Sequence, residues 1–199
     1  MNPPPPPADE ARLVQAAQNG DRRALDRLLR DQQERIHAVC RRITGNDADA
    51  LDATQDAMMA VVRGLPRFDG RARFSTWVYR VATNTCLDEL RRRKRRPVVG
   101  LPEHDGEVLD IPSDGEMAVD DGVATRLEVD AALAELPEEF RAAVVLRDLC
   151  QLDYAEISEV LDIPAGTVRS RIARGRRQLA DRIIGNQTTP SDVQSQRHD

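Results

Sequence analysis

The sequence predicts an all-α protein. Hydrophobic residues make up 40% of the 199 residues and aromatic residues only 3%, so any core depends on Leu, Val, Ile and Ala. Helix-forming residues dominate the chain, and it has no long alternating runs of Val, Ile and Thr of the kind that form strands. We therefore expect helices throughout, and the distribution of charge divides them into two groups.

Charge is sorted strongly along the chain. The formal net charge is -5, yet residues 91–96 are six consecutive basic residues, and residues 97–123 hold eight acidic side chains and no Lys or Arg. A Pro-, Gly- and acid-rich stretch with little apolar periodicity is typical of a linker without its own core. Fully extended, it could span roughly 90 Å, enough for two domains to act at separate places.

This pattern predicts two small helical domains joined by a flexible acidic linker. The five predicted segments are a disordered Pro-rich leader (1–19), an N-terminal helical module (20–96), the linker (97–124), a C-terminal helical module (125–185) and a disordered tail (186–199).

Several classes of function find no support in the sequence. No signal peptide is recognisable and no run approaches the ~18 apolar residues of a membrane span, so we expect a cytoplasmic protein and not a membrane protein. Cys40, Cys86 and Cys150 lie far apart without a CxxC pair, which favours reduced, buried thiols over a disulfide framework or a redox site. Without a metal-ligand cluster, a phosphate-cradling glycine loop or a nucleophile signature, we expect no enzyme activity, cofactor, metal or small-molecule substrate.

The N-terminal module begins with two predicted helices, 24–43 and 47–65, separated by the breaker "TGND". In the second helix Leu51, Met58, Val62 and Leu65 share one face, which we expect to be buried. The opposite face carries Asp49, Asp52 and Asp56, with Gln55 at its edge. This acidic face suits a basic partner surface, but stabilisation of the helix dipole together with solubility explains it equally well.

A loop and a third helix complete this module. The loop "RFDGRARF" is rich in arginine, glycine and aromatic residues, and Ser75 is placed to cap the helix that follows. The expected buried stripe of that helix is Phe74, Trp77, Val78, Val81 and Ala82, and its exposed side is Arg80, Asn84 and Arg91. Cations beside aromatic rings are what single-stranded DNA binding requires, although plain core packing is the simpler account of Trp77.

The C-terminal module predicts a helix-turn-helix. Asp153 and Glu156 have capping-box spacing before a short helix, 154–161, and Pro164 can open the next helix. In that last helix Val168, Ile172, Leu179 and Ile183 form the expected buried stripe. The outward face is polar and basic, and comprises Thr167, Ser170, Arg174 and Arg177 with Arg169, Arg171 and Arg176 at its flanks. A solvated amphipathic helix is the alternative, but arginines without acidic partners four residues away favour DNA binding in a major groove.

Three stretches together resemble the extracytoplasmic-function (ECF) subgroup of the sigma-70 family, the bacterial RNA polymerase initiation factors. They are "DALDATQDAM", "LPRFDGRARFSTWVYRVATNTCLDELRRR" and "LPEEFRAAVVLRDLCQLDYAEISEVLDIPAGTVRSRIARGRRQL". The resemblance implies an RNA polymerase sigma factor that binds the core enzyme, directs it to promoters with specific -35 and -10 elements, and promotes strand opening. It also implies a cognate anti-sigma protein as a partner.

The resemblance also implies residue roles. Asp49, Asp52, Gln55 and Asp56 match the segment that docks on the clamp helices of the largest polymerase subunit. The residues matching -10 recognition and melting are Arg67, Phe68, Asp69, Arg71, Arg73, Phe74, Trp77, Arg80, Asn84, Asp88 and Arg91. Those matching the -35 reader are Tyr154, Thr167, Arg169, Ser170, Arg171, Arg174 and Arg177, while Ala173 stands where some relatives carry a larger aromatic residue.

A conventional helix-turn-helix regulator that binds duplex DNA as a dimer is the main rival. It accounts for the C-terminal module but leaves the acidic face, the aromatic loop and the long linker without a role.

Overall fold

The computed structural model describes residues 8–95 and 121–187, which form helices and contain no strand. The N-terminal module comprises α1 (Ala8–Gln18), α2 (Arg22–Thr44), α3 (Asp47–Gly64), the 3-10 turn η1 (Leu65–Arg67) and α4 (Phe74–Arg95). The C-terminal module comprises α5 (Asp121–Ala134), α6 (Glu138–Asp148), α7 (Tyr154–Leu161) and α8 (Ala165–Gln187). The predicted all-α fold with two helical domains is confirmed.

Two predicted boundaries need correction. Residues 8–18 of the expected disordered leader form α1, because Val14 is buried and Leu13 and Ala17 pack beside it on the core. The first four residues of α5, 121–124, fall within the predicted linker. The rest of the linker, the proline tract and most of the tail lie outside the described residues.

The turn between α2 and α3 follows directly from its sequence. Gly45 ends α2 in the left-handed conformation, with φ +83°, and its N–H is donated to the carbonyl oxygen of Arg41. Asn46 then caps α3 by accepting the N–H of Asp49 at 2.8 Å. The predicted break at "TGND" is confirmed, and it sets α2 and α3 side by side.

The buried face of α3 differs from the one predicted. Its buried residues are Ala50, Ala53, Ala57 and Val61. Leu51 and Val62, which we expected in the core, are 62% and 40% exposed, whereas Leu65 is buried as expected. A narrow stripe of small side chains lets the α3 backbone approach α2 and α4 closely, and close packing of this kind turns the larger side chains outward.

Helix α8 crosses α6 through a glycine. Gly175 is buried, and a Cβ placed on it would lie 2.7 Å from Val144 Cγ2 and 3.3 Å from the Phe140 carbonyl oxygen. Ile172 and Val168, one and two turns earlier on α8, are buried as predicted. This crossing fixes the direction in which α8 presents its outward face.

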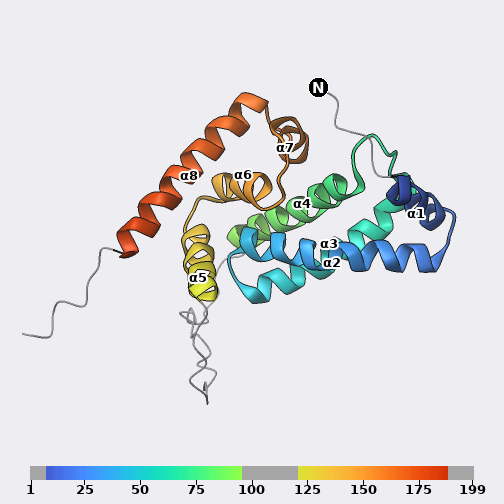
Figure 1. The fold of residues 1–199 in the computed structure, drawn as a ribbon, viewed down its shortest axis with the longest axis horizontal. Helices are drawn as coiled ribbons and strands as arrows, with labels where there is room; N and C mark the ends of the chain where they lie inside the picture. Colours follow the sequence, from blue (N-terminus) through green and yellow to red (C-terminus); the bar gives the residue numbers. More distant parts are fainter. Residues whose placement is uncertain (1–7, 96–120, 188–199) are drawn as a thin grey trace, which may run out of the picture.

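The two modules pack against one another, with α4 lying between the N-terminal helices and α6 and α7 (Figure 1). Thr76 of α4 donates its hydroxyl to Glu156 Oε1 of α7 at 3.0 Å. Asp130 of α5 pairs with both Arg41 and Arg42 of α2. The conformation described is therefore closed, although the length of the linker had suggested separated modules.

We expect Gly175→Val to lower the free energy of unfolding by about 1–3 kcal/mol, because added methyl groups overpack the α6–α8 crossing. Gly166 of α8 is the matched control, since nothing lies within 4 Å of a Cβ built there. Gly166→Ala should stabilise the helix by up to about 1 kcal/mol. Chemical denaturation of both variants checks this, and equal effects would contradict the close approach.

Candidate nucleic-acid interface

The loop between η1 and α4 is backed by three aromatic rings. The ring centroids of Phe68 and Trp77 are 5.1 Å apart, and those of Phe68 and Phe74 are 5.7 Å apart. Phe68 and Trp77 are half-buried, but Phe74 is only 1% exposed. Phe74 is therefore a core residue, as its place in the expected buried stripe predicted, and not the exposed DNA contact that the resemblance implied. The half-buried ring of Trp77 also packs against the core, as the simpler account of this residue expected.

The arginines of this loop point into solvent. Arg67, Arg71 and Arg73 are exposed, and Gly70 turns the backbone with φ +72°. Asp69 holds the turn by accepting the backbone N–H of Arg71 at 3.1 Å and pairing with the Arg71 side chain at 3.2 Å. Asp69 thus shapes the loop and moderates its charge, while Arg67 and Arg73 form no ion pair within the described ranges.

One face of α4 extends the basic surface away from the loop. Arg80, Asn84, Asp88 and Arg91 are all exposed and follow one another at helical spacing, as predicted. Arg91 is tied to Asp88 at 3.0 Å, whereas Arg80 and Asn84 make no side-chain hydrogen bond to any residue in 8–95 or 121–187. The unpaired donors therefore lie on the half of the face nearer the loop.

The outward face of α3 combines acidic and apolar side chains. Asp52, Gln55 and Asp56 are exposed, as the sequence predicted. Asp49 is half-buried and is tied to Arg93 and Asn46. Sequence reasoning missed the apolar part of this surface, where Leu51, Met59 and Val62 are 62%, 43% and 40% exposed. We call these residues, together with Asp52, Gln55 and Asp56, the α3 face.

The α3 face could have been found from the alanines. Ala50, Ala53 and Ala57 recur at helical spacing and would serve as well as a buried stripe. Choosing the larger apolar residues for the core was the error. Exposed large apolar side chains grouped with charges are typical of a protein interaction surface.

Helices α7 and α8 form the predicted helix-turn-helix. The capping box is present: Asp153 Oδ1 accepts the N–H of Glu156 at 2.8 Å, and Glu156 Oε2 accepts the N–H of Asp153 at 2.9 Å. Asp162 ends α7 with φ 52°, and the Pro164 carbonyl oxygen accepts the N–H groups of Thr167 and Val168 in the first turn of α8. Glu156 also receives the hydroxyl of Thr76, so one carboxylate shapes the motif and joins the modules.

The arginines of α8 fall into two groups. Arg171 pairs with Glu139 at 3.2 Å, and Arg176 pairs with Asp148. Arg174 and Arg177 are exposed and form no ion pair with any described residue. Exposed Ser170 lies beside them and donates its hydroxyl to the carbonyl oxygen of Thr167.

Tyr154 links the start of α7 to this outward face. Its ring lies below two guanidinium groups, 5.2 Å from Arg147 Cζ and 5.8 Å from Arg169 Cζ. Such cation–π contacts hold Arg169 at the edge of the α8 face and leave its N–H groups available. The predicted set of Tyr154, Arg169, Ser170, Arg174 and Arg177 is therefore gathered on one surface, with half-buried Thr167 beside it.

The surroundings of Cys86 and Cys150 favour the thiol over the thiolate, whereas the hydrogen bond with Cys86 lowers the pKa of Cys40. Cys40 and Cys86 are buried, and the neighbouring Cys40 thiol together with burial raises the pKa of Cys86. Burial raises the pKa of Cys150 to about 12.

Within the described ranges no three His, Cys, Asp or Glu side chains are grouped as metal ligands, and no helix is long and apolar enough to cross a membrane.

Two family models match the two modules. Residues 28–96 match sigma-70 region 2, and residues 126–179 match sigma-70 region 4. The ECF RNA polymerase sigma factor SigM of Mycobacterium tuberculosis is 38% identical over 184 residues, which cover 92% of this chain and 89% of that protein. The chain belongs to the ECF subgroup of the sigma-70 family.

Further relatives agree with this assignment. SigE of Mycolicibacterium smegmatis is 40% identical over 81% of this sigma factor, and the aligned part spans 63% of that longer protein. SigW of Bacillus subtilis is 31% identical over 85% of this chain and 94% of that protein. All three relatives are named ECF RNA polymerase sigma factors.

Solved structures show the same fold. CnrH, solved in complex with the cytosolic domain of CnrY, aligns with a TM-score of 0.65 and 22% identity over 89% of this chain and 98% of that chain. RpoE of Bartonella quintana, solved with the anti-sigma factor NepR, aligns with a TM-score of 0.61 and 17% identity over 80% of this chain and 96% of that chain.

Proposed function

We propose that this sigma factor binds core RNA polymerase through the α3 face, captures unpaired -10 DNA with the η1–α4 loop and α4, and reads the -35 element with α8. The observation that carries this division of labour is that a region 2 module and a region 4 module each expose arginines that have no acidic partner among residues 8–95 and 121–187. Sigma factors are initiation factors, so the polymerase supplies the chemistry. This protein contributes positioning, needs no cofactor, and works in the cytoplasm with the polymerase.

The α3 face has the composition of a docking surface. Leu51, Met59 and Val62 offer apolar area that the fold leaves uncovered, and Asp52 and Asp56 place negative charge beside it. An apolar centre with a charged rim is the usual anatomy of a protein interface, and the carboxylates select a basic partner. The clamp helices of the largest subunit are the proposed partner.

Strand opening follows from preferential binding. Unpaired bases need an apolar or stacking surface and their phosphates need cations. Phe68 and Trp77 supply half-exposed rings, and Arg67, Arg73 and Arg80 supply unpaired guanidinium groups around them. Binding energy that is available only to melted DNA makes opening favourable, because it offsets the few kcal/mol that unstacking costs.

Recognition of the -35 element depends on the unpaired arginines of α8. Arg174 and Arg177 are free to reach base edges or phosphates in a major groove, as Arg does when it binds guanine bidentately. Arg171 and Arg176 are held by Glu139 and Asp148, so their contribution is to position the helix on the phosphate backbone.

An anti-sigma protein completes the proposed set of partners. It is supported by the CnrH and RpoE structures, since RpoE was solved with the anti-sigma factor NepR and CnrH with the cytosolic domain of CnrY. A duplex-binding regulator remains the rival function, but it would leave the α3 face and the aromatic loop unused.

The docking proposal is tested by charge reversal. Asp52→Arg should weaken binding to core polymerase about tenfold, and Asp52→Arg with Asp56→Arg should weaken it further, because attraction to a basic surface becomes repulsion. Leu51→Ser should weaken binding without a change in helical content. Asp31→Arg on α2 is the control, an exposed acid outside the α3 face. Normal binding by the double variant would refute this docking surface.

The melting proposal is tested on two templates. Asn84→Ala, Phe68→Ala and Arg71→Ala should each slow open-complex formation on a duplex promoter, measured by permanganate reactivity of unpaired thymines in the presence of polymerase. A promoter with mismatches across the -10 element should partly restore opening, because the template no longer requires unstacking. Binding through the -35 element should change little. Unaltered opening by all three variants would return the duplex-binding regulator to contention.

The -35 proposal distinguishes base reading from backbone anchoring. Arg174→Ala should cost about 1–3 kcal/mol of binding free energy and relax the preference at one base pair. Arg176→Ala should weaken binding to all sequences alike. Its effect should be smaller than that of Arg174→Ala, because the Arg176 guanidinium is already paired with Asp148. Binding to a set of promoter variants, measured at several salt concentrations, gives both the loss of binding free energy and the change in base preference. Equal, sequence-independent losses would leave only electrostatic anchoring.

A further inference from the structure

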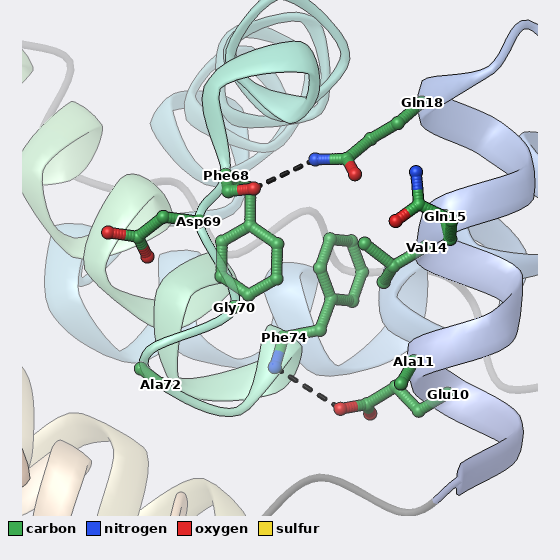
Figure 2. A pocket seen from close by; sticks show the side chains of 10 residues that line it. All are labelled: Glu10, Ala11, Val14, Gln15, Gln18, Phe68, Asp69, Gly70, Ala72 and Phe74. Carbon is green, nitrogen blue, oxygen red and sulfur yellow. Dashed lines mark hydrogen bonds between the residues drawn. The ribbon is translucent and has the colours of Figure 1, made fainter.

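Helix α1 holds both ends of the η1–α4 loop. Gln18 Nε2 donates one hydrogen bond to the Leu65 carbonyl oxygen at 3.0 Å and a second to the Phe68 carbonyl oxygen at 2.8 Å. At the other end, Glu10 Oε1 accepts the backbone N–H of Phe74 at 3.2 Å. Figure 2 shows Glu10 and Gln18 reaching from one side of α1 to the two ends of the loop.

The Glu10 contact replaces a cap that the sequence had assigned elsewhere. We expected Ser75 to cap α4, but α4 begins at Phe74, so Ser75 lies inside the helix. The first N–H groups of a helix have no partner within it. Glu10, 64 residues earlier in the chain, accepts one of them. The start of α4 therefore depends on α1 rather than on its own flanking sequence.

Packing alone does not fix the loop. A cavity of about 210 Å³ separates α1 from the loop, with Ala11 and Gln15 on one side and Asp69, Gly70 and Ala72 on the other. Val14 of α1 and Phe74 line the same cavity and belong to the same buried core cluster (Figure 2). The hydrogen bonds of Gln18 and Glu10 add to the packing of Phe68 and Phe74 a direct link between α1 and the backbone at each end of the loop.

We propose that Gln18 and Glu10 are positioning residues for promoter melting, which fix the backbone at the two ends of the loop so that Phe68 and the loop arginines face the unpaired strand. Neither residue touches DNA in this role, and α1 lies outside the region 2 match, which begins at residue 28. The inference rests on the proposed function of the loop. The hydrogen bond to the Phe68 carbonyl oxygen matters most for positioning, because Phe68 is a residue proposed to contact a base.

Gln18→Glu is the decisive variant, since it keeps the size of the side chain and removes both donors. Loss of two hydrogen bonds to the loop should slow open-complex formation on a duplex promoter by about tenfold. Opening on a promoter pre-melted at the -10 element should return close to the wild-type rate. Polymerase holoenzyme should also lose part of its preference for the matched over a mismatched single-stranded -10 oligonucleotide.

A second pair of variants tests the other end of the loop. Glu10→Ala removes the acceptor for the Phe74 N–H and should slow opening, whereas Glu10→Gln keeps an oxygen acceptor and should behave like the wild type. Gln15→Ala is the matched control, because Gln15 lines the same cavity and its side chain makes no hydrogen bond within the described ranges. It should leave opening and base preference unchanged.

The outcomes separate this inference from the proposed function. Wild-type opening and base preference by Gln18→Glu, alongside defective Phe68→Ala and Arg71→Ala, would overturn the positioning role alone. No defect in any of these variants would overturn the proposed function of the loop. Equal losses of core binding and of opening on both templates would show that α1 only stabilises the fold, and would also overturn the positioning role.

Discussion

Close packing of small side chains on α3 is the constraint on which the N-terminal module depends. The buried residues of α3 include Ala50, Ala53 and Ala57, which have no side-chain atom beyond Cβ. Helix α3 therefore lies close to α2 and α4, and only one narrow stripe along it is buried. The larger apolar residues of α3 are then left on the outer side. Exposed large apolar side chains of this kind are typical of a surface that binds another protein.

Ion pairing distributes the positive charge of the molecule. Several arginines are bound by nearby carboxylates, as Arg176 is by Asp148 and Arg41 is by Asp47 and Asp130. Arg80 and Arg174, which form no ion pair with any described residue, lie on exposed helix faces. A net acidic protein can therefore present local basic surfaces to DNA, because the attraction is set by the nearest charges within a screening length of about 10 Å.

The closed arrangement of the two modules follows from polar contacts as well as apolar ones. Glu156 closes the capping box of α7 and accepts the hydroxyl of Thr76, and Asp130 joins α5 to α2. At the same junction Arg141 is 6% exposed and desolvation lowers its pKa. Its guanidinium lies against Gly45, where an added Cβ would be 2.6 Å from Nη1. Gly45 is thus required both for its backbone conformation and for the room that it leaves.

The sequence by itself determined all of the helices except α1, several of their caps and the family, because these depend on neighbours within a few residues. The break at Gly45 and Asn46, the capping box of Asp153 and Glu156, and the exposed rows on α4 and α8 are local patterns of this kind. Only the tertiary structure decided which of two possible stripes of α3 is buried, because both satisfy the helical period. It also decided that Glu10 caps α4, since this contact depends on two segments far apart in the chain meeting in space.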